Sequence, residues 1–231
     1  MEKNDKYRDI FCSSHQLFLS QGYEATTIRQ VSDQAGVSLG LTNHFFHSKE
    51  TLACQILSMI SAYTSLFCSV THPCPDPLHR HVLAMRIRIL FLLKSSYRTF
   101  YLDTLRQDIL FSKLEKTPSR IFYQLADLYR FPADDDLFLL YGVYTPYNYE
   151  KTLILGRESG LFSTIPLEDI PDYIAISSFE HFVAQDILNQ ALTYARQAAD
   201  TVLSRMPTRI PDDFVQNHIK ERPSSLNPDK V

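Results

Sequence analysis

Apolar residues in the first part of the chain recur every three or four positions, the spacing of one helix face. They predict three helices, over residues 6–21, 28–34 and about 38–44. Gly22 is suited to end the first helix, because glycine readily takes the left-handed backbone that closes a helix. Thr26 or Thr27 can cap the second helix and Ser38 the third. The short connection through Gly36 makes the last two a candidate helix-turn-helix.

A fourth helix is predicted from Ser48 up to a proline-rich segment at 71–77. One of its faces carries Leu52, Ile56, Ile60, Tyr63 and Phe67. We expect this helix to serve two domains and place the boundary within it. Residues 1–66 would form one domain and 67–206 the other.

The rest of the chain keeps helical spacing, so the predicted fold class is all-α. Near-heptad apolar positions begin at Leu78, and further helices are expected at about 118–130 and 135–160. Residues 173–206 contain neither Gly nor Pro and predict two more. The tail 207–231 is rich in proline and charge, and we expect it to be disordered.

Composition narrows the function classes. The 231 residues are 45% hydrophobic and 21% charged, which is ordinary globular usage, with a net charge of −3. That charge excludes binding of nucleic acid by bulk positive charge and leaves only a local site. The four cysteines form no CxxC pair, and the sequence lacks a signal-peptide pattern and an uninterrupted apolar run of membrane-span length. We expect a cytoplasmic protein outside the membrane.

The segment TTIRQVSDQAGVSLGLTNHFFHSKETL, residues 26–52, carries a recognisable motif. Its features are the threonine-rich helix start, AGVS at 35–38, Gly40, the pair Phe45-Phe46, and Ser48-Lys49-Glu50 followed by Leu52. This segment resembles the DNA-binding region of the tetracycline-repressor (TetR) family of bacterial regulators, over roughly the first 65 residues. The resemblance implies a homodimeric transcriptional regulator, a repressor rather than an activator, released from operator DNA by a small-molecule effector bound in the second domain.

The exposed face of the third helix is the predicted reading surface for a major groove. Asn43 can pair with adenine, Thr42 can offer its methyl group to thymine, and His44 can reach a base edge or phosphate. Gly40 indicates close backbone approach, to a neighbouring helix or to a phosphate. By the resemblance, Lys49 contacts a phosphate. The complete predicted DNA-binding set is Thr27, Arg29, Ser38, Leu39, Gly40, Thr42, Asn43, His44 and Lys49.

This segment departs from the family pattern in ways that favour weak electrostatic binding. The family usually has Tyr where this chain has Asn43, and often a polar residue where it has Leu39. Residues 1–50 hold five Lys/Arg and six Asp/Glu, a net charge of −1. The alternative function is therefore a helical ligand-binding or interaction protein whose helix-turn-helix no longer binds DNA.

Two features of the second domain carry further predictions. Pro146 within a helical pattern predicts a kink after Gly142, and the surrounding tyrosines indicate either an effector pocket or a bent aromatic core. The predicted pocket residues are Tyr141, Tyr144, Pro146 and Tyr147. The apolar face of the last helix predicts a four-helix dimer interface. That face comprises Leu188, Ala191, Leu192, Ala195, Ala199 and Val202.

Other chemistry has little support in the sequence. Cysteines and histidines gather around the proline-rich segment, where they could hold zinc, form a redox switch, or remain unliganded, as such residues usually do. They are Cys68, His72, Cys74, His79 and His81. There is no phosphate-binding glycine loop, GxSxG or HExxH. We therefore expect no enzyme activity, no cofactor and no metal.

Overall fold

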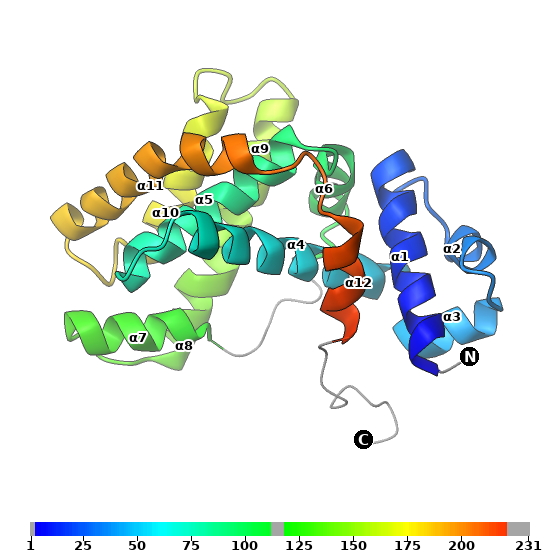
Figure 1. Ribbon diagram of the computed structural model, residues 1–231. Helices are drawn as coiled ribbons and strands as arrows, with labels where there is room; N and C mark the ends of the chain where they lie inside the picture. The colour runs from blue at the N-terminus through cyan, green and yellow to red at the C-terminus, as the bar shows by residue number, and fades with distance from the viewer. Residues whose placement is uncertain (1–2, 112–117, 221–231) are drawn as a thin grey trace.

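The described part of the chain, residues 3–111 and 118–220 of a computed structural model, is helical and has no strand (Figure 1). The predicted all-α fold is confirmed. Three helices, α1 (Lys3–Gln21), α2 (Ile28–Gln34) and α3 (Leu39–Phe46), form a small group at one end, which we call the head. The remaining helices form a larger body. The long helix α4 (Lys49–Thr71) runs from the head into the body.

Side-chain caps explain where the head helices begin. Thr27 and Gln30 form a reciprocal capping box at the start of α2, with the Thr27 backbone N–H donating to Gln30 Oε1 at 2.8 Å. Ser38 accepts from the backbone N–H of Leu41 at the start of α3. Ser48 does the same for α4. The predicted starts of these three helices are confirmed.

Helix α4 contributes to the core on both sides of the expected domain boundary. Leu52, Ile56 and Ile60 are fully buried, and Tyr63 is 7% exposed. By length and composition α4 could cross a membrane, but here it packs as a core helix against α5 (Pro77–Lys94), α11 (Gln185–Arg205) and α12 (Asp212–Lys220). These residues share one apolar cluster with the head and with α6 (Arg98–Arg106), whereas Cys68, further along α4, belongs to a second cluster in the body. The division at residue 66 stays a prediction.

The body is built mainly around α5 and α11, which pack along each other. Its elements are α5 (Pro77–Lys94), α6 (Arg98–Arg106), α7 (Arg120–Tyr129), α8 (Asp135–Leu139), the π-helical turn η2 (Leu140–Tyr144), α9 (Thr145–Glu158), the short 3-10 turn η3 (Leu167–Asp169), α10 (Ile170–Phe179) and α11 (Gln185–Arg205). Asp134 caps α8 by accepting from the backbone N–H of Leu137.

The predicted interruption between Gly142 and Pro146 is present as a π-helical turn. Pro146 lies in the first turn of α9, directly after η2, because a proline has no N–H to continue the helical ladder. Gly142 is needed here since a Cβ on it would lie 2.5 Å from the Phe122 ring.

The predicted dimer face of α11 is wrong. Its six residues are at most 3% exposed within this single chain, where they pack in the body core with residues of α5 such as Val82 and Leu83. An apolar stripe shows that a helix face is buried but not which chain covers it. Ala195, in the middle of this face, is fully buried.

The prediction of a disordered tail is also wrong for residues 207–220; residues 221–231 lie outside the described part of the chain. Helix α12 (Asp212–Lys220) packs against α1 and α4, on the front of the molecule in Figure 1. Ile210 is fully buried and Val215 is 2% exposed. The Phe214 ring meets the Tyr63 ring edge to face, with centroids 4.9 Å apart. The C-terminal segment therefore joins the body to the head.

Candidate nucleic-acid interface and ligand cavity

Helix α3 divides cleanly into a buried and an exposed side. Thr42 and Phe46 are fully buried, while Leu39, Gly40, Asn43 and His44 are exposed. These four exposed residues form one continuous surface, because positions one, four and five apart share a helix face. We call it the recognition face. Four of the predicted DNA-binding residues thus lie together on the outside of the head.

Packing beneath α3 holds the recognition face outward. The Tyr7 ring stacks on Phe46 at 4.4 Å and meets Phe45 edge to face at 5.6 Å. Val31 is fully buried between α2 and its neighbours. These side chains form the small core beneath the recognition face. Tyr7 was not identified from the sequence, since it precedes the clear apolar repeat of the first helix.

Thr42 does not belong to the DNA-binding set. Its side chain is fully buried, and its Oγ1 lies 2.8 Å from Ser32 Oγ in a hydrogen bond between α2 and α3. The predicted methyl contact with thymine is wrong, because position 42 shares the inward face of the helix with Phe46. The threonine instead fixes the two helices of the turn against each other.

Lys49 is engaged within the protein. Its Nζ donates to the carbonyl oxygens of Tyr23 at 3.0 Å and Thr26 at 2.9 Å, and lies 4.1 Å from the centre of the Tyr23 ring. Burial lowers the pKa of this ammonium group. These contacts satisfy carbonyls between α1 and α2 and tie the start of α4 to the head. The expected phosphate contact of Lys49 stays a prediction.

The remaining predicted contacts lie at the edges of the recognition face. Thr27, Arg29 and Ser38 are exposed, and Arg29 is the one lysine or arginine between Thr26 and Ser48. A Cβ added at Gly40 would meet no atom within 4 Å. This excludes a neighbouring helix as the reason for that glycine, and the other alternative, close approach to a phosphate, stays a prediction.

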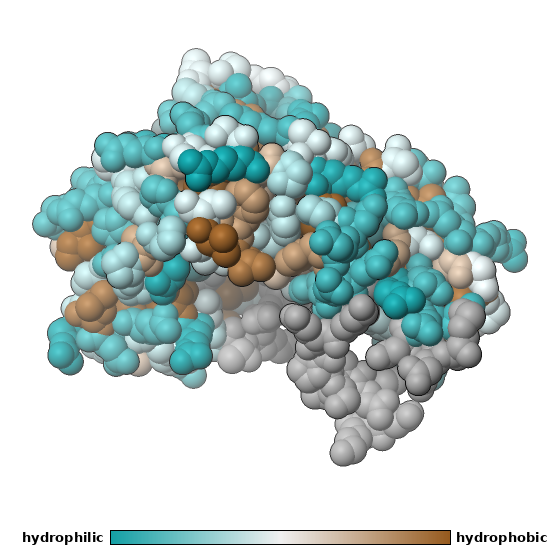
Figure 2. All heavy atoms as spheres, in the orientation of Figure 1, coloured by the Kyte–Doolittle hydropathy of each residue, from teal (hydrophilic) through white to brown (hydrophobic). Residues whose placement is uncertain are grey.

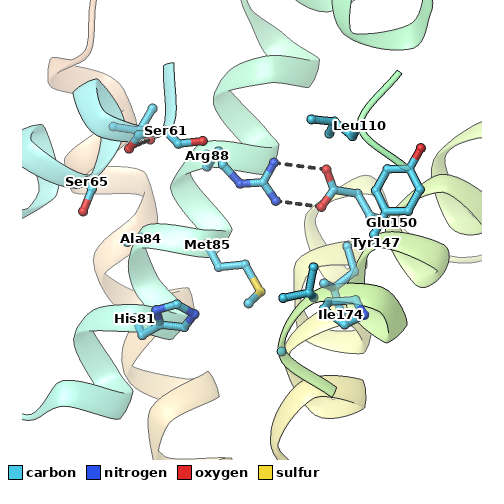
Figure 3. Close-up of a pocket in the computed structure, with 14 residues that line it drawn as sticks. Ser61, Ser65, His81, Ala84, Met85, Arg88, Leu110, Tyr147, Glu150 and Ile174 are labelled. Carbon is cyan, nitrogen blue, oxygen red and sulfur yellow. Dashed lines mark hydrogen bonds and ion pairs between the residues drawn. The ribbon is translucent and has the colours of Figure 1, made fainter. Parts of the chain in front are cut away.

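A cavity of about 420 Å³ lies in the body between α4 and α5 on one side and η2, α9 and α10 on the other (Figure 3). Its volume is within the usual range for small-molecule sites. Apolar lining comes from Ala84, Met85, Leu110, Val143, Pro146 and Ile174. Polar lining comes from Ser61, Thr64, Ser65, His81, Arg88, Tyr147 and Glu150.

Two of the four predicted pocket residues line this cavity. Pro146 and Tyr147 do so, whereas Tyr141 and Tyr144 do not. The Tyr141 ring lies tilted against the His181 ring with centroids 4.3 Å apart, and the Tyr144 ring meets Phe111 edge to face at 6.0 Å. Both tyrosines lie in the π-helical turn, whose residue spacing differs from that of an α-helix, so the pattern of a plain helix could not place them.

An ion pair crosses one wall of the cavity. Arg88 of α5 donates to both carboxylate oxygens of Glu150 of α9, at 3.1 and 2.6 Å (Figure 3). The Tyr101 hydroxyl of α6 donates to the same carboxylate. Burial and the Glu150 charge both raise the pKa of Tyr101 well above its usual value. The tyrosine therefore stays protonated and the ion pair joins three helices.

His81 lies at the other end of the cavity from this ion pair. Burial, together with the charges of Arg88 and Arg80, lowers its pKa to about 4. Its ring meets Phe179 edge to face, with centroids 5.6 Å apart. At neutral pH it is an uncharged imidazole with one donor and one acceptor nitrogen.

The cysteines and histidines around the loop before α5 do not gather into one site. The Cys68 thiol is buried, which raises its pKa to about 12. The Cys74 thiol donates to the Asp76 carbonyl, and His79 Nδ1 lies 2.7 Å from the Asp76 carboxylate. Among the described residues, no three His, Cys, Asp or Glu side chains are grouped as metal ligands.

Comparison with known proteins gives a family match in the head. Residues 10–56 match the family model of bacterial regulatory proteins, tetR family. No sequence among the curated proteins matches the chain.

Solved structures with a similar chain path include several regulators. A γ-butyrolactone receptor, described as an ArpA-like protein, has 14% identity and a TM-score of 0.38, with 87% of this chain and 100% of that chain covered. TylP, a tetR regulator from Streptomyces fradiae, has 16% identity and a TM-score of 0.41, covering 88% and 98%. The fatty acid degradation regulator FadR from Bacillus halodurans has 16% identity and a TM-score of 0.31, covering 88% and 97%.

The family match covers the caps of α2, α3 and α4 and the whole recognition face. These are the elements that set the helix-turn-helix geometry described above. The helix-turn-helix segment of residues 10–56 is thus of the kind found in bacterial regulatory proteins of the tetR family.

Proposed function

We propose that the chain is a homodimeric repressor that leaves a pseudo-palindromic operator when a small molecule occupies the cavity. The observation that carries the DNA-binding part is the recognition face. Four residues of α3 are exposed on a helix whose opposite side is held by Thr42 and Phe46. Such a rigid, outward helix face is what enters a major groove.

Readout by this face would depend on hydrogen bonds more than on charge. Asn43 can donate to and accept from adenine, and His44 can reach a base edge or phosphate. Arg29 at the start of α2 would supply a phosphate contact, and backbone N–H groups near Gly40 a second. With so few cations in each head, tight binding needs two heads on one duplex.

Two connections would carry the effect of a ligand from the cavity to the head. The first is α4, which begins at the Lys49 tie and carries Ser61 and Thr64 into the cavity wall. The second is α6, where Tyr101 donates to Glu150 of the cavity. Asp103, on the same helix, accepts from the backbone N–H of Glu24 at 3.1 Å, just after α1.

A ligand that favours one arrangement of α4 and α6 would shift the separation of the two heads. The dimer surface must lie outside the six buried residues of α11, since these are already packed in one chain. Size-exclusion chromatography with light scattering on the full chain tests for the dimer, and a monomer at operator-binding concentrations would contradict it.

The alternative function, a ligand-binding protein that no longer binds DNA, is favoured by one observation. The use of Lys49 inside the head leaves Arg29 to meet the phosphates near the recognition face. The two functions predict different results when the purified chain is offered random DNA duplexes.

Selection of random duplexes by the purified chain, followed by fluorescence anisotropy at several salt concentrations, decides between them. We expect an enriched inverted repeat, and a salt dependence that Arg29→Ala flattens by about one unit per protomer. Lys49→Ala should lower the stability of the head instead. The absence of any enriched sequence would refute DNA recognition and favour the alternative.

A further inference from the structure

The charges that face the cavity cancel each other. Both terminal nitrogens of Arg88 are bonded to Glu150, and Glu150 Oε1 also accepts from Tyr101. Glu150 is only 4% exposed, so little water can replace Arg88 as the partner of its carboxylate. An anionic ligand would have to take Arg88 from Glu150 and leave that carboxylate buried without its cation. A cationic ligand that paired with Glu150 would leave the Arg88 guanidinium without its anion. Both exchanges are costly.

Most hydroxyl protons in the wall are already used. Ser61 donates to the Leu57 carbonyl at 3.0 Å and Thr64 to the Ser61 carbonyl at 3.1 Å. The Tyr147 hydroxyl donates to Asp108 at 3.1 Å, away from the cavity. The two α4 side chains consequently offer lone pairs to a ligand, and Tyr147 offers mainly its ring.

His81 differs from these groups. It lines the cavity, and its ring nitrogens have no hydrogen-bond partner among the residues that the structure describes. The surrounding wall is apolar, with Met85 between His81 and Arg88 and Ile174 on the facing helix (Figure 3). An uncharged imidazole in such a wall can donate one hydrogen bond and accept another.

We propose that the cavity binds an uncharged amphipathic molecule whose hydroxyl or carbonyl group is hydrogen-bonded by His81 and whose apolar body lies against Met85, Leu110 and Ile174. This proposal rests on the proposed function only in treating the cavity as the effector site. Desolvation of an apolar body supplies the affinity, and the single polar group fixes its orientation.

Three probes of equal length and different charge test the proposal: octanol, octanoate and octylammonium. Each is titrated into the full chain at neutral pH by isothermal calorimetry. We expect octanol to bind at least about tenfold more tightly than either ion, because only the ions must break the Arg88–Glu150 pair. Tighter or equal binding of octanoate or octylammonium, or no binding of octanol, would overturn the proposal.

Two variants test the assigned roles. His81→Phe keeps a ring of similar shape without a polar atom and should weaken octanol binding about tenfold, while His81→Gln, which retains a donor and an acceptor, should restore most of it. Octanol affinity that is unchanged in His81→Phe would refute the role of His81. Glu150→Gln leaves the Arg88 charge unpaired and should reverse the preference toward octanoate, measured as thermal stabilisation by each probe. A preference that stays with octanol would refute the charge argument.

Failure of the proposed function would give different results from failure of the ligand assignment. If octanol binds as described but leaves the affinity for the selected duplex unchanged, the ligand class stands and the cavity is not an effector site. If the chain binds no duplex, the calorimetric comparison of the three probes is unaffected.

Discussion

The Glu150→Gln substitution should destabilise the fold by far more than the loss of one hydrogen bond. It removes the charge that holds Arg88, whose side chain is 23% exposed against 5% for Glu150. Removing one partner of a buried ion pair costs about 3–5 kcal/mol, because the other charge is left uncompensated. The partial exposure of Arg88 to the cavity reduces this, so we expect about 2–4 kcal/mol.

A second variant separates lost pairing from lost packing. In the double substitution Arg88→Met and Glu150→Gln no charge remains, and the introduced amide can still accept from Tyr101. Its free energy of unfolding should therefore lie closer to wild type than that of Glu150→Gln alone. Urea unfolding followed by circular dichroism at neutral pH measures all three proteins. A Glu150→Gln cost below about 1 kcal/mol, or a double variant less stable than the single one, would refute the reasoning.

Three further predictions concern folding. Ala195→Glu should lower the free energy of unfolding by at least about 4 kcal/mol, because it forces a charge and extra volume into a fully buried site. Gln197→Glu, on the exposed side of the same helix, should cost little, and equal urea midpoints for the two variants would contradict the assignment of the buried face. Gly22→Ala should cost about 1–3 kcal/mol, since Gly22 has φ +85° and a Cβ there would lie 2.7 Å from Asp103 Oδ2; a wild-type melting temperature would refute this. Burial and the Arg209 charge lower the pKa of His15 to about 4, so the unfolded chain binds this proton more readily than the folded one. The contribution of His15 to stability is therefore full above pH 6.5 and should fall by about 2 kcal/mol between pH 7 and 5. A His15→Gln variant with the same dependence of stability on pH would contradict this.

The helices themselves could be predicted from the sequence because their signals are local. Thr27, Ser38 and Ser48 are caps that act within three residues, and the apolar repeat of α4 marks its buried face directly. Family resemblance added the position of the recognition helix. Local signals of this kind need no knowledge of the rest of the fold.

The errors arose where a residue's role depends on a partner distant in sequence. The stripe around Ala195 is apolar in either setting, and only the fold shows that α5 covers it. Lys49 is charged in any context, and only the fold places carbonyl oxygens within reach of its ammonium. Ile210 and Val215 are too few to make a periodic pattern, yet both are buried in the apolar cluster that the head shares with α4.

The cavity could be anticipated only in part for the same reason. Pro146 indicated a break in the helix, but His81 and Arg88 come from α5, more than fifty residues earlier in the chain. The Arg88–Glu150 pair joins residues 62 positions apart. No spacing rule connects such residues, so the ligand-facing chemistry became visible only with the fold.

The measurement that tests the central claim most directly is the affinity of Asn43→Ala for a selected operator and for a scrambled duplex. Asn43 is exposed on the recognition face, and its loss should cost about 1–3 kcal/mol on the operator with little change on the scrambled duplex. Thr42→Val is the matched control on the buried side of the same helix, and it should lower stability while keeping the preference for the operator. Equal losses on both duplexes for Asn43→Ala would show that this face does not read bases and would contradict the account.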